Sequence, residues 1–244
     1  MTDTASTVSV VIPVLDDAEE LAACLLALAA QTRSPDEIVV VDNGSSDDSA
    51  EVARRLGARV VTEHRQGIPH AAAAGYDAAT GSIIARLDAD SRPRLDWVEN
   101  VVAAMADPRV DAVTGPGRFH DLPALLRGPA TLVYLGAYYA LTWLAVANTP
   151  LWGSSMAVRG DVWKTASGSV HRDADVHDDM DLAFVLGPRA VVRFERSIGV
   201  GVSARSIRGG RQWRRRMDRA ITTLRVNWAT QPPWERWRER FSGR

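Results

Sequence analysis

Short apolar runs alternate with amphipathic segments along the first half of the chain. The apolar runs are rich in valine and isoleucine, as in strands buried on both faces, and span residues 8–14, 38–41, 58–62, 82–87 and 110–114. The segments between them repeat apolar residues at helical spacing and span residues 18–31, 48–56, 69–78 and 95–106. This alternation predicts parallel βαβ units, and therefore an α/β fold with a Rossmann-like, doubly wound, mostly parallel sheet and helices on both faces.

Two acids stand where predicted strands end. Asp42 follows the run 38–41, and Asp88 follows the run 82–87. Doubly wound sheets bind ligands outside the carboxyl ends of their strands. We therefore expect Asp42 and Asp88 to face the same crevice.

The alternation stops after Gly117. Residues 122–151 are mostly apolar, and residues 130–147 carry no charge. The length is marginal for a membrane span, and the glycine, threonine and tyrosine content makes it a weak one. A buried helix or a helix on a membrane surface is the preferred interpretation.

Charge is unevenly distributed along the chain. The 244 residues carry a net charge of −1, which gives no reason to expect nucleic acid as a partner. From Arg205 to Arg244, however, about a dozen arginines stand against three acids, and four tryptophans are interleaved with them. Such a segment suits a membrane surface, or equally a helix docked on the core. We treat residues 201–244 as a C-terminal helical extension of a domain over residues 1–200.

The cysteine content and the first residues bear on location. Cys24 is the one cysteine and lies in an apolar helical pattern, so no intrachain disulfide is expected. Residues 1–7 lack the basic and apolar regions of a signal peptide. We expect a cytoplasmic protein, with the basic extension allowing peripheral attachment to the inner face of the plasma membrane.

The motif Asp88-Ala89-Asp90 places two carboxylates directly after a buried strand. A hard cation such as Mg²⁺ or Mn²⁺ prefers oxygen ligands and keeps positions for phosphate oxygens. We expect Asp88 and Asp90 to bind such an ion, although a capped turn would use the same residue types. His171 or His177 could add a ligand.

Two further acidic segments are candidates for chemistry. Residues 42–47, Asp-Asn-Gly-Ser-Ser-Asp, can present Asp42 to a base or ribose, or simply form a turn. Residues 177–181, His-Asp-Asp-Met-Asp, stand where a helix begins. The helix dipole alone favours acids there, but one of these carboxylates could also serve as a general base.

In order and spacing, these motifs resemble glycosyltransferase family 2, an inverting family with the GT-A fold. The matching stretches are residues 8–17, 41–47, 87–90 and 153–159, the last followed by 177–179. The resemblance covers about residues 9–195. It implies a nucleotide-sugar-binding half over residues 8–117 and an acceptor-binding half over residues 118–200.

The resemblance also implies roles for individual residues. It makes Asp179 the catalytic base and Asp90, assisted by Asp88, the metal ligand. The donor-binding residues are expected to be Pro13, Leu15, Asp17, Asp42 and Asp88, with Arg65 as a nearby cation. The acceptor-binding residues are expected to be Trp152, Gly153, Ser154 and Asp178.

Several positions depart from the family pattern. Leu15 stands where relatives often carry an aromatic residue, and Asp17 and Asp178 replace a common glutamate. Residues 72–73 are alanines where relatives often carry Arg-Asn. The segment 212–216, Gln-Trp-Arg-Arg-Arg, does not match the Gln-x-x-Arg-Trp motif of processive synthases, so single transfers are expected.

The resemblance implies a metal-assisted single displacement from a nucleotide-diphosphate sugar, with UDP, GDP and dTDP all open as the nucleotide. A lipid-linked or hydrophobic acceptor suits the apolar segment and the basic extension, and a soluble acceptor stays open. A dinucleotide-dependent oxidoreductase would need Gly-x-Gly-x-x-Gly after the first strand, where residues 13–18 read Pro-Val-Leu-Asp-Asp-Ala. A nucleotidyltransferase would want a glycine- and lysine-rich phosphate loop there. A non-catalytic scaffold on a decayed transferase fold is disfavoured by the intact acidic motifs.

Overall fold

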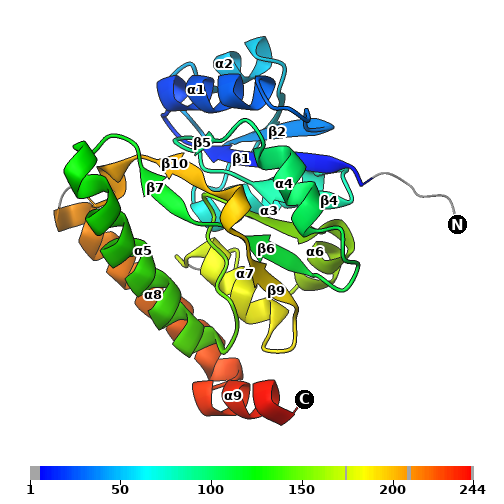
Figure 1. The fold of residues 1–244 in the computed structure, drawn as a ribbon, viewed down its shortest axis with the longest axis vertical. Coiled ribbons are helices and arrows are strands. Elements are labelled where there is room, and N and C mark those ends of the chain that lie inside the picture. The colour runs from blue at the N-terminus through cyan, green and yellow to red at the C-terminus, as the bar shows by residue number, and fades with distance from the viewer. Residues whose placement is uncertain (1–5, 174, 208–209, 243–244) are drawn as a thin grey trace, which may run out of the picture.

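The computed structural model describes residues 6–173, 175–207 and 210–242. Its main sheet has seven strands in the order β3-β2-β1-β4-β8-β6-β9 (Figure 1). The strands are β1 (Val8–Val14), β2 (Glu37–Asp42), β3 (Arg59–Thr62), β4 (Ile83–Arg86), β6 (Ala112–Thr114), β8 (Met156–Arg159) and β9 (Val192–Phe194). Strands β1 to β4 pair in parallel, as the alternation predicts. The predicted α/β fold is confirmed.

Strand β8 was not foreseen. It lies between β4 and β6 and runs antiparallel to both, while β6 and β9 pair in parallel. The sheet therefore stays mostly parallel but changes direction at β8. This insertion places residues 152–155, which immediately precede β8, against the end of β4.

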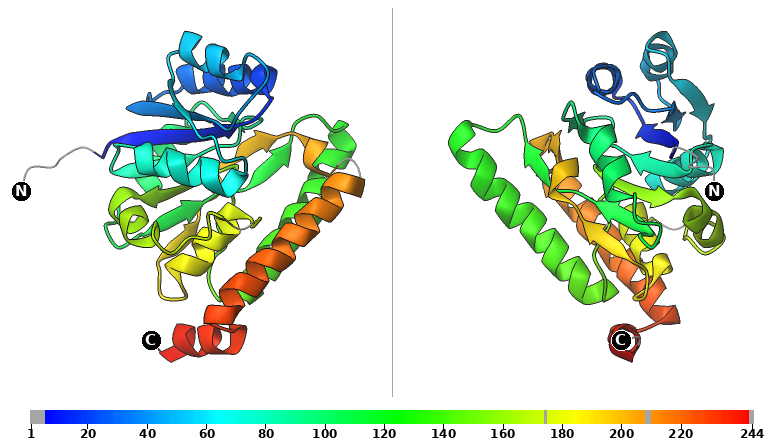
Figure 2. Two further views of the ribbon diagram at one scale, coloured as in Figure 1. Left: turned by 180° about the vertical axis from the view of Figure 1, so that it is seen from behind. Right: turned by 45° about the vertical axis from the view of Figure 1, so that its right-hand side comes forward.

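Helices cover both faces of the sheet (Figure 2). Successive side chains of a strand point to opposite faces, so a strand that is apolar throughout, such as β1, needs a covering layer on each face. The helices that pack on the sheet are α1 (Ala18–Ala29), α2 (Ser49–Arg55), α3 (Ile68–Ala78), α4 (Trp97–Ala104), α6 (Gly160–Ala166) and α7 (Asp178–Leu186). On one face Val10 and Ile12 of β1 pack with α1 and α4. On the other, Val11 packs with α3 and α7. Two buried layers thus fix the carboxyl edge of β1, β2 and β4.

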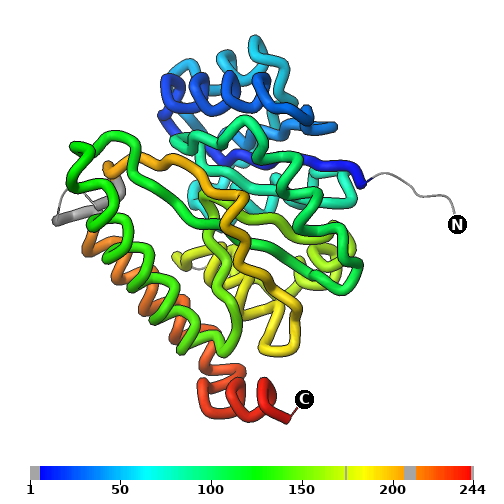
Figure 3. Tube along the Cα trace, in the orientation of Figure 1, coloured from blue at the N-terminus to red at the C-terminus, as the bar shows by residue number. Residues whose placement is uncertain are grey.

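A small second sheet, in the order β5-β10-β7, adjoins this edge. Its strands are β5 (Arg92–Pro93), β7 (Gly117–Phe119) and β10 (Val200–Val202). In the Cα trace the chain runs from β9 back past β7 towards the start of α8 (Gly210–Thr230) (Figure 3). This return path brings residues 203–205 close to the ends of strands from the first half of the chain.

Two long helices, α5 (Ala124–Val146) and α8, run side by side along one edge of the molecule, with α9 (Pro233–Ser242) at their end (Figures 1 and 2). The Arg216 guanidinium donates to the Tyr134 hydroxyl, and Trp228 Nε1 donates to Ala145 O at 3.3 Å. By length and composition α5 could cross a membrane, but only 22% of its most apolar 18-residue window is buried. The structure thus contains the predicted helix. Because most of its apolar window is exposed, the interpretation as a buried core helix is wrong.

Candidate functional site

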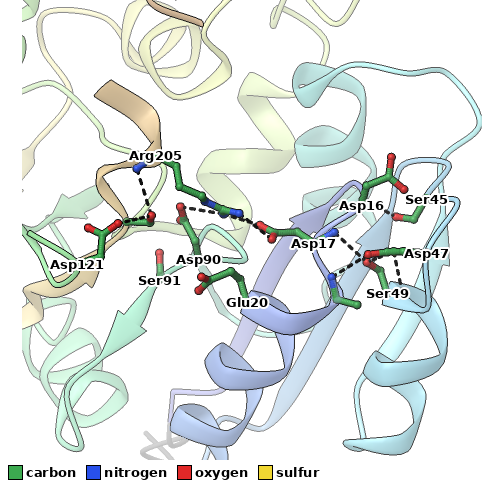
Figure 4. A network of polar contacts seen from close by, with 12 residues as sticks. Asp16, Asp17, Glu20, Ser45, Asp47, Ser49, Asp90, Ser91, Asp121 and Arg205 are labelled. Carbon is green, nitrogen blue, oxygen red and sulfur yellow. Dashed lines mark hydrogen bonds and ion pairs between the residues drawn. The ribbon is translucent and has the colours of Figure 1, made fainter. Parts of the chain in front are cut away.

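The loops after β1 and β2 are tied together at the carboxyl edge of the sheet. Ser45 N donates to Asp42 Oδ1 at 3.1 Å, and Ser46 N donates to Asp16 Oδ1 at 2.6 Å. Pro13 is buried in β1, whereas the Leu15 side chain is 46% exposed. The loop after β1 and the loop after β2 thus meet at one edge of the sheet, and Figure 4 shows Asp16 and Asp17 beside Ser45, Asp47 and Ser49.

Asn43 organises the neighbouring loop. Its buried amide donates to the carbonyl oxygens of Glu63 at 3.0 Å and Arg65 at 2.8 Å, and its Oδ1 accepts from Gly67 N at 2.8 Å. The Arg65 side chain is 60% exposed and lies 3.3 Å from Glu63 and 3.8 Å from the exposed Asp173. The Arg65 side chain therefore lies along the surface of its own loop. Asn43 has a structural role in holding this loop, which the sequence analysis did not assign to it.

Arg205 joins two predicted ligand-binding acids that lie far apart in the sequence. Its guanidinium donates to both carboxylate oxygens of Asp17, at 2.9 and 2.7 Å, and to Asp90 Oδ2 at 3.2 Å (Figure 4). The preceding backbone is fixed because Ala204 N donates to Asp121 Oδ1 at 2.7 Å. Sequence analysis assigned Arg205 to the basic extension and missed this role.

Asp88 and Asp90 have different surroundings. Ser154 Oγ donates to Asp88 Oδ2 at 2.5 Å, and Arg86 Nη2 donates to Asp88 Oδ1 at 3.1 Å. Burial, reinforced by the nearby Asp88 carboxylate, raises the pKa of Asp90 to about 6. A cation between the two carboxylates would relieve this repulsion.

The donor set fits a divalent ion that is shared with a substrate. Within the described part of the chain, no group of three or more histidine, cysteine, aspartate or glutamate side chains is arranged to hold a metal. Two carboxylates leave positions free for phosphate oxygens and water, which is how Mg²⁺ is usually bound. His171 Nδ1 lies 2.8 Å from Asp181 and His177 Nε2 lies 3.1 Å from Arg216 O, so both rings have partners of their own.

The acidic pair at the start of α7 is split between two environments. Asp178 forms an ion pair with Arg86, whose side chain is only 3% exposed. Burial raises the pKa of Asp178 to about 7, and the Arg86 charge partly offsets this effect. Asp179 instead accepts from Gly153 N at 2.7 Å through Oδ2 and from Met180 N at 2.7 Å through Oδ1. The two neighbours can therefore serve different purposes.

The loop of residues 152–154 connects these parts. The Trp152 ring lies against Gly117, where an added Cβ would come within 2.1 Å of the ring. A Cβ at Gly153 would lie 2.7 Å from the Arg86 guanidinium. Both close approaches require glycine. Since Ser154 contacts Asp88 and Gly153 contacts Asp179, a single dipeptide spans the predicted metal ligand and the predicted base.

Comparisons with known proteins agree with this geometry. Residues 9–159 match the family described as Glycosyl transferase family 2. Glycosyltransferase AglE of Haloferax volcanii is 37% identical over 127 residues, 49% of this chain and 42% of that protein. An uncharacterized glycosyltransferase of Mycobacterium tuberculosis is 44% identical over 111 residues, 46% of this chain and 49% of that protein. The match thus spans less than half the length of these curated relatives.

Solved structures share the fold over nearly the whole chain. A mannosyltransferase from Pyrobaculum calidifontis, in complex with GDP-Man and Mn²⁺, superposes with a TM-score of 0.74 at 23% identity, covering 96% of this chain and 68% of that one. Glucosyl-3-phosphoglycerate synthase from Mycobacterium tuberculosis, with Mn²⁺, UDP and glucosyl-3-phosphoglycerate, gives 0.65 at 21% identity, covering 91% and 80%. The predicted GT-A fold is therefore confirmed, and Mn²⁺ in both structures accords with the expected divalent metal. With the family match covering most of the sheet and its carboxyl edge, this chain belongs to glycosyltransferase family 2.

Proposed function

We propose that this protein is an inverting glycosyltransferase that moves a sugar from a nucleotide-diphosphate sugar to an acceptor hydroxyl. One observation carries the proposal: the dipeptide Gly153-Ser154 contacts both Asp88 and Asp179. Residues that would hold a diphosphate and a residue that could accept a proton therefore border the same small space. A single displacement needs the leaving group and the base on opposite sides of one reacting carbon.

The donor would lie along the rim formed by the loops after β1, β2 and β4. Pro13, Leu15, Asp17 and Asp42 are the proposed contacts for the nucleoside, and UDP, GDP and dTDP remain candidates. Mg²⁺ or Mn²⁺ would be held by Asp90 with Asp88. When bound, such an ion neutralises charge on a diphosphate leaving group.

Asp179 is the proposed base. Its carboxylate is held by the Gly153 and Met180 amides, which fix its orientation. It would take the proton of the acceptor hydroxyl, while Asp178, paired with Arg86, fixes the start of α7. A positioned base of this kind contributes about 10²–10⁴-fold to the rate.

The acceptor is proposed to approach over Trp152, Gly153, Ser154 and Asp178, with one sugar transferred per encounter. A lipid-linked or hydrophobic acceptor is favoured by the surface beside this loop. The seven large apolar side chains of α5 that are at least 45% exposed are Leu125, Leu126, Leu132, Val133, Leu141, Trp143 and Leu144.

We further propose that the protein is cytoplasmic and attaches peripherally to the inner face of the plasma membrane. On α8, Trp213, Met217 and Ile221 repeat every four residues and are 47%, 39% and 51% exposed, beside the exposed Arg214 and Arg215. An apolar stripe flanked by arginines suits an anionic lipid surface. Sedimentation with anionic vesicles, but not with neutral ones, is the expected result. If the protein stays in the supernatant with both anionic and neutral vesicles, membrane attachment is contradicted.

The decisive test of the proposed function compares Asp179→Asn with a matched control, Asp161→Asn, on the exposed side of α6. Thermal shifts with UDP, GDP and dTDP, with and without Mn²⁺, first identify the nucleotide. A ligand at 100-fold its Kd raises the free energy of unfolding by about 2.7 kcal/mol. D179N should keep this shift and lose transfer by about 10²–10⁴-fold, while Asp90→Asn should lose the metal-dependent shift. Near wild-type transfer by D179N would exclude Asp179 as the base.

A further inference from the structure

An open apolar groove lies between α5 and the sheet, with a volume of about 590 Å³. Its wall includes Gly117, Leu132, Gly136, Ala140, Trp143 and Pro150. Two of the wall hydroxyls are engaged within the protein. Tyr139 donates to Gly115 O at 2.8 Å, and Thr131 Oγ1 accepts from Phe119 N at 3.3 Å. The surface left to an occupant is therefore strongly apolar.

One end of the groove reaches the loop proposed to bind the acceptor. Gly117 is part of the wall, and the Trp152 ring lies directly on it. Pro150 is also part of the wall, and the next residue, Leu151, accepts from the Tyr138 hydroxyl at 2.6 Å. Two residues further, Gly153 contacts the proposed base Asp179. A molecule lying in the groove would thus have one end beside the reacting groups.

The groove also continues onto the outer surface of α5. Leu132 contributes to the wall while remaining 75% exposed, and Trp143 does the same at 45%. No charged residue occurs between residues 128 and 147. Soluble ligands are usually oriented by a few polar groups in their pockets, whereas this surface offers a long apolar track. A flexible hydrocarbon chain can follow such a track from the acceptor loop to a surrounding lipid phase.

We propose that this groove binds the hydrocarbon chain of a lipid whose polar end carries the acceptor hydroxyl. The inference rests on the proposed function and specifies its substrate class. The volume lies within the roughly 300–1,000 Å³ of ordinary ligand sites, so a chain can be largely enclosed. Chain length then decides acceptor affinity, and the polar end alone binds weakly.

The test fills the groove with a side chain and measures chain binding without any nucleotide. Ala140→Leu adds three carbons to the wall, whereas Ala137→Leu makes the same change on an exposed position of α5 outside the wall. The probe is dodecyl maltoside below its micelle concentration, with methyl maltoside as the same sugar without the chain. Titration calorimetry should show saturable dodecyl maltoside binding to wild type and A137L, at least tenfold weaker binding to A140L, and no detectable binding of methyl maltoside.

Equal affinity of A140L and wild type would overturn the proposal, and so would an equal loss in A137L, because the chain would then lie on the outer face of α5. Wild-type dimerisation that A140L abolishes would also overturn it, since a second copy would then cover the groove. If A140L does not fold, Gly136→Leu replaces it. A Cβ at Gly136 comes no closer than 4.0 Å to Leu132, so the wall has room there.

Hydrolysis of the nucleotide sugar by water, measured without acceptor, separates this inference from the proposed function. If the protein hydrolyses the nucleotide sugar and A140L binds the chain as wild type does, only the proposed lipid-chain site is refuted. If the protein binds no nucleotide and A140L abolishes chain binding, only the proposed glycosyltransferase activity is refuted.

Discussion

Arg205 occupies a position where a divalent cation would compete with it. The guanidinium lies 3.2 Å from Asp90 Oδ2 and 2.7 Å from Asp17 Oδ2. A metal on Asp90 must therefore displace or share this contact. Arg205→Gln removes the competing charge and keeps a side chain of similar polarity, so we expect it to bind Mn²⁺ more tightly than wild type does.

The magnitude follows from the exposure of the pair. The Arg205 side chain is 47% exposed, so solvent screens its attraction to Asp90. Such pairs contribute at most about 1 kcal/mol, which corresponds to roughly a fivefold change in an equilibrium constant. At pH 8, where Asp90 is ionised, R205Q should bind Mn²⁺ up to about fivefold more tightly.

The assay is a titration of free Mn²⁺ by electron paramagnetic resonance at fixed ionic strength. Arg94→Gln is the matched control, because Arg94 is also a surface arginine paired with an aspartate, Asp96, at 3.3 Å. Both variants change the net charge equally, so a general field effect would appear in both. Weaker Mn²⁺ binding by R205Q than by R94Q would refute the reasoning and show that Arg205 organises the metal site.

Two further predictions concern pH and stability. Because the pKa of Asp90 is raised to about 6, the Mn²⁺ affinity of the wild-type protein should fall about tenfold per pH unit below that value, and an affinity that stays constant below pH 6 would contradict this. The raised pKa also means that the contribution of Asp90 to the free energy of unfolding is largest below about pH 4 and is lost as pH rises through 6, which urea titrations at several pH values would show. Arg86→Met leaves Asp178 buried without its counterion and should cost about 3–5 kcal/mol in urea denaturation. Adding Asp178→Asn to Arg86→Met should recover part of that loss. If the free-energy effects of the two substitutions simply add, a direct interaction between Arg86 and Asp178 is contradicted.

Local spacing was sufficient to determine the elements that build the donor side of the site. The continuous apolar run of β1, which is buried along its whole length, and the helical spacing in α1 are both local patterns, so the βαβ pattern can be recognised from the sequence. Parallel pairing then brings the carboxyl ends of β2 and β4 to one edge without further information. This is why Asp42 and Asp88 were correctly expected to follow strands at that edge.

The contact between Arg86 and Asp178 could have been anticipated in part. Arg86 is the one charged residue in the predicted strand of residues 82–87, whose other residues are apolar apart from Ser82. A buried charge requires a partner, so the sequence already indicated that a carboxylate must approach β4. It could not indicate which one, because Asp178 lies 92 residues away and their contact depends on tertiary structure, in which β8 pairs with β4.

The remaining features were decided by tertiary structure alone. Arg205 reaches Asp17 across 188 residues and Asp90 across 115, because the chain returns from β9 along β10. The sequence placed Trp228 and Trp237 equally well on a membrane or on the core, and the structure docks both on α5, through Ala145 O and Leu144 O. The groove beside α5 likewise exists only because that helix stands off the sheet. Local pattern fixes which residues are apolar, whereas long-range packing decides which apolar surfaces are covered and which stay open to a ligand.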